Sequence, residues 1–217
     1  MILPEATLFP QSLLPLYIFE PRYRQMLADV LATHRMFVVV MQRLYTTREM
    51  PLPVGGLGLV RAAVTHPDGT SHLILQGLSR VRICETVRYK PYRIQRIEPF
   101  PSEPAPAEVL KPLLQQVQHL VRKQIQTNLA LNGTPFWFSN GESTPLGPCS
   151  EVTARQLLEF VSRLHDPECV ADLVGATLVR DPCMRQLLLG TANVAQRLEI
   201  LAGILREQLA QGPGKKG

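Results

Sequence analysis

The pattern of apolar and polar positions is clearest between residues 8 and 42. An extended apolar segment, broken by prolines, leads to Glu20-Pro21. Proline is favoured at the first helical position, because its φ is already helical and its missing N–H loses no partner there. The residues after it recur at helical spacing and predict one buried helix face, made of Tyr23, Met26, Leu27, Val30 and Leu31.

A second apolar run extends from Met36 to Met41. It is rich in β-branched side chains and too short for an independent helix, so we predict a buried strand. With the extended segment before Pro21, it predicts a strand–helix–strand unit.

Residues 54–97 carry the pattern of a sheet. The glycine-rich residues 54–58 lead into a strand over residues 59–65, and at this strand entry glycine permits a bulge or a close backbone approach. No Lys-Ser/Thr pair follows these glycines, so a phosphate-binding loop is excluded. Asp68-Gly69 predicts a hairpin turn, after which the chain returns along residues 71–76.

The sheet then continues over residues 80–88, and residues 92–97 provide its last strand. We expect Gly77-Leu78-Ser79 to break the strand between residues 76 and 80. Alternation predicts two faces after this break, with Val81 and Ile83 on one face and Arg80, Arg82 and Cys84 on the other.

Four prolines within residues 98–106 predict a stiff linker, and the pattern after it is helical. We therefore predict a β-rich part (residues 1–100), a linker (101–106), a helical part (107–211) and a flexible tail (212–217). Asp166-Pro167 and Asp181-Pro182 each predict an N-cap followed by proline, and Thr153 with Gln156 fits a capping box. The predicted helices span residues 111–132, 153–164, 167–177, 182–189 and 194–209. Helical spacing predicts the buried faces of the second and the last of these, made of Leu157, Phe160, Val161 and Leu164 and of Leu198, Leu201, Leu205 and Leu209.

The strings LFP, LPLYIFEPRYRQML and MFVVVM resemble the N-terminal substrate-recognition domain of the Lon protease family, a domain type that also occurs in cereblon and in stand-alone bacterial proteins. The strings VGGLGLV, PYRIQRIEP, VADLVGATL and RLEILAGIL extend the resemblance along the chain. The resemblance implies an α+β fold, with an N-terminal PUA-like bent β-barrel, one helix packed on it, and a C-terminal helical bundle. Gln11 stands where the family usually has glycine, which bears on the tightness of the first turn.

Composition is that of a globular chain of 217 residues, with 45% hydrophobic and 19% charged residues. No apolar run approaches the roughly 20 residues of a membrane span, and no signal peptide is visible, so we expect a cytoplasmic protein without membrane association. The four cysteines (Cys84, Cys149, Cys169, Cys183) show no metal-binding spacing, so we expect reduced, mostly buried thiols and neither metal nor cofactor.

Chemistry-bearing motifs are missing from the sequence. There is no GxxxxGK[ST] string, no Ser-Lys peptidase context and no GxSxG elbow, so a peptidase label would rest on family resemblance alone. The five histidines are expected at ordinary surface positions. We therefore expect no catalytic residues, and the resemblance implies a recognition module whose partner is an unfolded or extended polypeptide or another protein.

Two stretches are candidates for binding. Phe136, Trp137 and Phe138 lie in a long loop that either forms an exposed aromatic lip or is pinned to the core, the favoured alternative. Tyr17 and Phe19 join them if exposed, although core packing is expected for both. The alternative partner is RNA. The chain has a net charge of +5, and a basic cluster in its β-rich part would provide phosphate contacts and base stacking, although an ordinary solvated strand face is the favoured interpretation. The cluster consists of Arg80, Arg82, Arg88, Lys90, Tyr92, Arg93 and Arg96.

Overall fold

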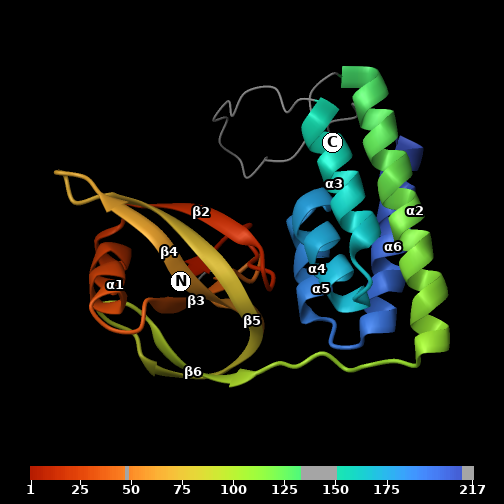
Figure 1. Cartoon of the computed structure of the whole chain (residues 1–217). Coiled ribbons are helices and arrows are strands. Elements are labelled where there is room, and N and C mark those ends of the chain that lie inside the picture. The colour runs from red at the N-terminus through yellow and green to blue at the C-terminus, as the bar shows by residue number, and fades with distance from the viewer. Residues whose placement is uncertain (47–48, 133–150, 212–217) are drawn as a thin grey trace. The chain divides into compact units, whose positions relative to one another are not determined.

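The computed structural model describes residues 1–46, 49–132 and 151–211 (Figure 1). The predicted aromatic loop with Phe136, Trp137 and Phe138 lies outside these residues, as do Cys149 and the tail. The chain divides into two compact units, Met1–Pro101 and Ser102–Gly217, which are described separately. Within the described residues, no helix is long and apolar enough to cross a membrane.

The first unit is a mixed sheet with one helix. Its strands follow the order β1-β3-β4-β5-β2, and β6 pairs with β5. Among the described strands of this unit, the β1–β3 pair alone is parallel. Strand β4 pairs with one edge of β5 along both residues 71–76 and residues 81–82. On the other edge, β2 pairs with residues 71–76 and β6 with residues 81–82 and beyond, so β2 and β6 follow one another along it. The elements are β1 (Ile2–Leu3), β2 (Leu13–Ile18), α1 (Pro21–Leu31), β3 (Met36–Met41), β4 (Val54–Thr65), β5 (Ser71–Arg88) and β6 (Ile94–Pro99).

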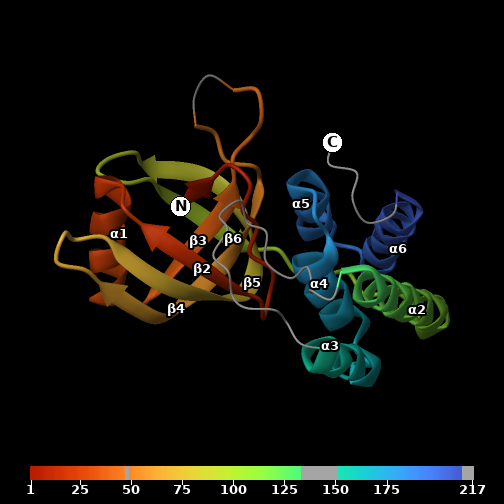
Figure 2. The ribbon, with the colours of Figure 1, turned by 90° about the horizontal axis from the view of Figure 1, so that it is seen from above.

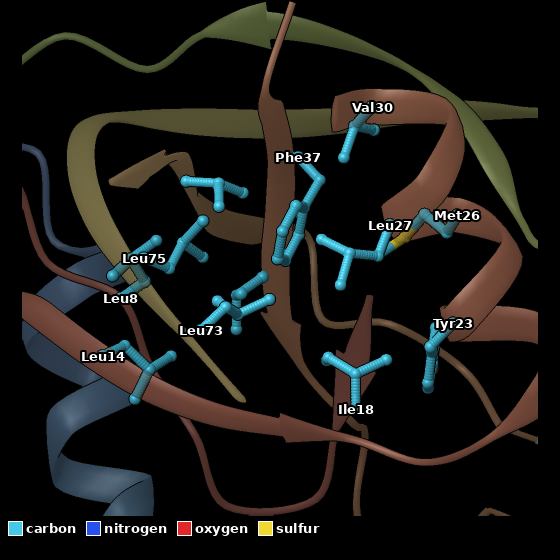
Figure 3. Close-up of a cluster of buried hydrophobic side chains, with 12 residues drawn as sticks. Leu8, Leu14, Ile18, Tyr23, Met26, Leu27, Val30, Phe37, Leu73 and Leu75 are labelled. Carbon is cyan, nitrogen blue, oxygen red and sulfur yellow. The ribbon is translucent and has the colours of Figure 1, made fainter. Parts of the chain in front are cut away.

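Helix α1 confirms the predicted strand–helix–strand unit. Pro21 is its first residue, and the predicted apolar face is buried apart from the partly exposed Leu31. Figure 3 shows this face pointing into a cluster with Phe37 of β3 and Leu73 and Leu75 of β5. Tyr23 also holds β1, since its hydroxyl accepts from Ile2 N (3.2 Å) and donates to Ile2 O (3.1 Å). The parallel strand β1 was not predicted.

Glycines let the segment before β2 lie directly on the sheet. A Cβ added to Gly56 would collide with the carbonyl oxygen of Leu8, and one added to Gly77 with that of Phe9. The predicted close approach is therefore confirmed for β4, and its register shifts between Leu57 and Gly58. The predicted strand break at Gly77 is wrong: β5 runs unbroken through it, because the bare side of this glycine receives the Phe9 carbonyl.

Two further expectations for the sheet are wrong. Arg80 is only 4% exposed, so the alternation of apolar and basic residues along β5 starts after it. Strand β6 begins at Ile94 rather than at residue 92, because Tyr92 and Arg93 belong to the preceding turn. There the Tyr92 hydroxyl donates to Asp29 Oδ2 (2.7 Å) and Arg93 Nη2 donates to the carbonyl oxygen of Glu49 (2.8 Å).

The second unit is helical, and α2 and α6 lie side by side in it (Figure 2). Asp166 and Asp181 cap α4 and α5 as predicted: Asp166 Oδ1 accepts from Glu168 N (3.0 Å) and Asp181 Oδ1 from Cys183 N (2.7 Å). Of the predicted core leucines of α6, Leu198, Leu201 and Leu205 are fully buried, whereas Leu209 in the last turn is only partly buried. The helices are α2 (Ala107–Asn132), α3 (Glu151–Arg163), α4 (Pro167–Leu178), α5 (Pro182–Gly190) and α6 (Val194–Gln211).

Helices α2 and α3 both begin earlier than predicted. The first turn of α2 forms ahead of Pro112, since Val109 N and Leu110 N both donate to the carbonyl oxygen of Pro106 at 3.0 Å, so Pro112 removes only one later hydrogen bond. Because α3 begins at Glu151, Thr153 lies inside the helix and the predicted capping box is wrong.

The predicted apolar face of α3 is also wrong in part. Phe160, which was expected in the core, is 53% exposed, whereas Val161 is buried as predicted.

A buried arginine joins the start of this unit to its helices. Arg197 of α6 is fully buried, and its Nη1 lies 3.0 Å from Asp172 Oδ1 of α4. Its Nη2 donates to Ser102 Oγ (2.7 Å) and its Nε to the carbonyl oxygen of Thr191 (3.1 Å). Such a charge is tolerated inside a protein only when paired and hydrogen-bonded, so these contacts fix the chain where the unit begins.

Candidate functional site: an exposed apolar face on the sheet

The outward side of β2, β5 and β4 presents two rows of residues across three strands. The registers place Tyr17 beside His72 and His72 beside Val64, and likewise Pro15 beside Ile74 and Ile74 beside Ala62. Side chains alternate between the two faces of a strand, so the intervening Leu14, Ile18, Leu73 and Leu75 are the ones that enter the core.

The large apolar side chains of these rows remain open to solvent, as do those of Leu13 and Phe19 at the two ends of β2. We call the set the outer apolar face; its members and exposed fractions are Leu13 (62%), Tyr17 (45%), Phe19 (58%), Val64 (61%) and Ile74 (42%). Single exposed apolar residues are ordinary, but a contiguous group of them marks a binding surface.

Tyr17 and Phe19 were expected to pack in the core, and this expectation is wrong. Ile18 between them is 1% exposed and takes the inward position, so both aromatic rings point outward. Their rings stack, with centroids 5.8 Å apart and an interplanar angle of 28°. Tyr17 also contacts the ring of His72 at a centroid distance of 4.7 Å. The structure therefore brings the two predicted candidates together.

The free edge of β2 is poorly suited to pairing with an added strand. Within the described residues β2 pairs only with β5. Pro15, near the middle of β2, has no N–H, and proline is tolerated in a strand where its nitrogen faces away from the neighbouring strand. An added strand would therefore meet a position that donates no hydrogen bond, which favours contact through the face over contact through the edge.

The predicted basic cluster is divided by the structure. Arg80 is buried, and Arg82 lies opposite Glu98 with its guanidinium 5.2 Å from the centre of the Phe100 ring. Arg96 Nη1 lies 3.1 Å from Glu85 Oε1. These contacts leave much of the cluster's charge already compensated within the unit.

The remaining members, Arg88, Lys90, Tyr92 and Arg93, meet at the turn between β5 and β6. The Arg88 guanidinium lies 5.7 Å from the Tyr92 ring centre, and that of Arg93 lies 5.2 Å from the Tyr89 ring centre. The hydrogen bond to Asp29 raises the pKa of the Tyr92 hydroxyl. Each tyrosine thus has one ring face covered by an arginine, which reduces the area left for stacking on a nucleobase.

The cysteines are more exposed than predicted, and two histidines lie together. Cys84 and Cys183 are exposed and Cys169 is partly exposed, so the expectation of mostly buried thiols is wrong for the described cysteines. Among the described residues no group of three or more His, Cys, Asp or Glu side chains could hold a metal ion. His66 and His72, however, meet across the β4–β5 turn, a pairing that spacing alone did not suggest.

Solved structures define the class of protein to which this fold belongs. The N-terminal domain of the Mycobacterium avium complex Lon protease matches with a TM-score of 0.71 at 17% identity, over 96% of this chain and 97% of that one. The Lon N-terminal domain protein from Xanthomonas campestris matches with a TM-score of 0.59 at 20% identity, over 93% and 95% of the two chains. The chain therefore has the α+β fold of Lon N-terminal domains.

Sequence comparison then identifies the family. Residues 1–207 match the model of the ATP-dependent protease La (LON) substrate-binding domain, and the chain belongs to this family. The Lon protease of Dictyoglomus thermophilum is 23% identical over 215 residues, and that of Methylocella silvestris 27% over 209 residues. These alignments cover 96% and 93% of this chain but only 24% and 23% of the relatives, so the chain spans about a quarter of their length. The predicted resemblance is confirmed.

Proposed function

We propose that this chain is a non-catalytic recognition domain that binds apolar segments of unfolded or extended polypeptides on the outer apolar face. The observation that carries the proposal is the group of large, exposed apolar side chains on three adjacent strands. The family description, a substrate-binding domain, supports a polypeptide as the partner.

The proposed contact works through the hydrophobic effect. Tyr17, Phe19 and Ile74 present apolar area that the apolar side chains of an extended segment can cover, and its burial contributes about 25 cal/mol per Å². The stacked rings of Tyr17 and Phe19 lose little conformational freedom on binding, because they already restrain one another.

The test is a binding titration with a fluorescently labelled, permanently unfolded protein such as reduced and alkylated lactalbumin. The double variant Tyr17→Ser/Phe19→Ser should bind about tenfold or more weakly, since central aromatic anchors contribute most of the affinity of an interface. Tyr45→Ser is the matched control, because Tyr45 is fully exposed in the segment between β3 and β4, away from the outer apolar face. Unchanged affinity in the double variant would refute the proposed face.

The predicted loop residues Phe136, Trp137 and Phe138 are proposed as a second point of contact on the strength of their sequence alone. Comparison of in-cell crosslinking of wild type and Trp137→Ala tests this: an unchanged set of partners rejects a role for the loop without bearing on Tyr17 and Phe19. In the proposed non-catalytic role, the pure protein leaves casein intact with and without ATP.

RNA binding, the alternative prediction, gains no support from the arrangement of the basic cluster, where Arg82 and Arg96 face acidic residues and Arg80 is buried. A gel-shift assay over a salt series with structured and single-stranded RNA separates the two functions. Tight binding that falls steeply with salt would favour RNA over a polypeptide.

A further inference from the structure

The turn that joins β4 to β5 projects from the sheet (Figure 1). Two imidazole rings meet at this turn. His66 follows β4, His72 lies on β5, and His66 Nε2 is 2.8 Å from His72 Nδ1. The rings meet edge to face, with centroids 5.1 Å apart and planes at 87°. His72 is exposed and His66 partly exposed, so solvent and solutes reach the pair.

The backbone beneath the two rings is held firmly. His66 N donates to the carbonyl oxygen of Thr70 (2.8 Å), and Gly69 N donates to that of His66 (2.9 Å). Asp68 Oδ1 accepts from both the N–H (2.9 Å) and the hydroxyl (2.7 Å) of Thr70. Gly69 has a φ of 81°, which glycine adopts without strain. The two histidines are therefore presented from a fixed hairpin, and only their side chains have to move to accept a ligand.

We propose that His66 and His72 form a chelating site for a divalent late transition cation, Cu²⁺ or Ni²⁺. Imidazole nitrogen is a preferred ligand of these ions. In the hydrogen-bonded pair, one of the two facing nitrogens carries the proton. Each neutral ring can carry its proton on its other nitrogen, Nδ1 of His66 and Nε2 of His72. Both facing lone pairs then become available without net loss of a proton, and the cation takes the place of the hydrogen bond.

The two nitrogens are close enough to hold one metal ion. With metal–nitrogen bonds of about 2.0–2.1 Å, two ligands at a right angle lie about 2.9 Å apart, whereas tetrahedral ligands lie about 3.4 Å apart. The observed 2.8 Å is a hydrogen-bond distance that changes when the rings turn, and it brings both nitrogens within reach of one ion in either geometry. Each ring has to turn so that its lone pair leaves the line between the nitrogens. The exposure of the pair leaves room for this movement, and the Tyr17 ring, with its centroid 4.7 Å from that of His72, limits how far His72 turns. The other coordination positions are filled by water.

The charged groups around the turn neither favour nor oppose the binding of a cation. Asp68 lies in the turn, and its carboxyl pKa is lowered, chiefly by its hydrogen bonds from Thr70, so it is anionic near neutral pH. The guanidinium of Arg24 from α1 lies against Gly69 on the same turn. One negative and one positive group offset each other, so the two nitrogens themselves have to provide the affinity, and the Irving–Williams order then places Cu²⁺ above Ni²⁺ and both above a tetrahedrally disposed Zn²⁺ site.

The experiment is calorimetric titration of the full chain, without an affinity tag and after treatment with a chelator, with CuCl₂, NiCl₂ and ZnCl₂ near neutral pH. We expect one Cu²⁺ per chain at this site and weaker binding of Ni²⁺ and Zn²⁺. His66→Asn and His72→Asn should each lower the Cu²⁺ affinity about tenfold or more, because a single imidazole does not chelate. His34→Asn and His119→Asn, which lie elsewhere, should leave it unchanged.

A spectroscopic readout separates this site from general surface binding. Electron paramagnetic resonance of the Cu²⁺ complex should show coupling to two imidazole nitrogens in the wild type and to one in either single variant. Circular dichroism confirms that the variants are folded. Equal Cu²⁺ affinity in wild type and His66→Asn, or tighter binding of Zn²⁺ than of Cu²⁺, rejects the site; neither result bears on polypeptide binding by Tyr17 and Phe19.

Discussion

Strand β5 carries a different kind of surface in each of its two halves. Residues 71–76, between β2 and β4, expose Ile74, which lies between Pro15 and Ala62, one row away from the exposed side chains of Tyr17 and Val64. Residues 81–88, beside β6, expose charged side chains that already meet partners, as Arg96 meets Glu85 and Arg88 lies over Tyr92. Covering exposed apolar side chains lowers their free energy, whereas covering charged groups that already have partners gains little. Residues 71–76 are therefore the better candidate for a binding site.

Gly77 lies between the two halves, and its replacement should have the largest effect. In Gly77→Val the added Cβ would collide with the carbonyl oxygen of Phe9, and backbone is costly to displace. We expect destabilisation by about 3 kcal/mol or loss of the folded unit, measured by urea unfolding.

Gly203→Ala is the matched control for this prediction. The space around Gly203 in α6 is open, so alanine should stabilise the helix by about 0.5–1 kcal/mol. A Gly77→Val protein as stable as wild type would show that β5 is not held at this point by the segment before β2.

A charge placed in each half of β5 tests the comparison directly. Ile74→Asp puts a carboxylate at the centre of the outer apolar face and should weaken binding of an unfolded polypeptide about tenfold, because the charge has to be desolvated when the face is covered. Val87→Asp makes the same kind of change in the other half, where Val87 is 64% exposed, and should leave that affinity unchanged. Fluorescence anisotropy measures both; equal losses in the two variants would contradict the distinction between the halves.

Sequence reasoning succeeded where the information is local. The bounds of β3, the start of α1 at Pro21 and the caps at Asp166 and Asp181 follow from short-range pattern and backbone chemistry, and the structure confirms them. Arg197 was missed because its partners Asp172 and Ser102 are 25 and 95 residues away in the sequence, and only the fold brings them together.

The outer apolar face could not be read from the sequence for a different reason. The run LLPLYI is apolar at every position, so it lacks the alternation with polar residues that tells an outward side from an inward one. Tyr17 and Phe19 were named as candidates, but Leu13, Val64 and Ile74 were not. Their common face is set by the pairing of β2 and β4 with β5, which sequence spacing does not give.

Gln11 offers a smaller change, with a gain of stability. It has a φ of 62°, and its N–H donates to the carbonyl oxygen of Gly77 at 2.8 Å, so the turn keeps its left-handed conformation without the glycine usual at this position. A non-glycine residue in this region is strained, and relief of the strain outweighs the greater freedom of glycine in the unfolded chain. Gln11→Gly should therefore stabilise by about 1 kcal/mol and raise Tm by about 2–4 °C. Gln11→Ala, which keeps a Cβ, should give no gain, and an equal gain in both variants would contradict the strain.

The smallest expected effect concerns the charged half of β5. Arg96 and Glu85 have side chains that are 68% and 56% exposed, so their ion pair is well screened by water. Arg96→Gln should lower the free energy of unfolding by no more than about 0.5 kcal/mol and leave polypeptide affinity unchanged. The same variant bears on the RNA alternative, because loss of a phosphate contact lowers the slope of log affinity against log salt by about one. An unchanged slope in Arg96→Gln would show that Arg96 makes no phosphate contact. A lower slope would show that the charged half of β5, residues 81–88 beside β6, also binds a ligand, and the two halves would then not differ as proposed.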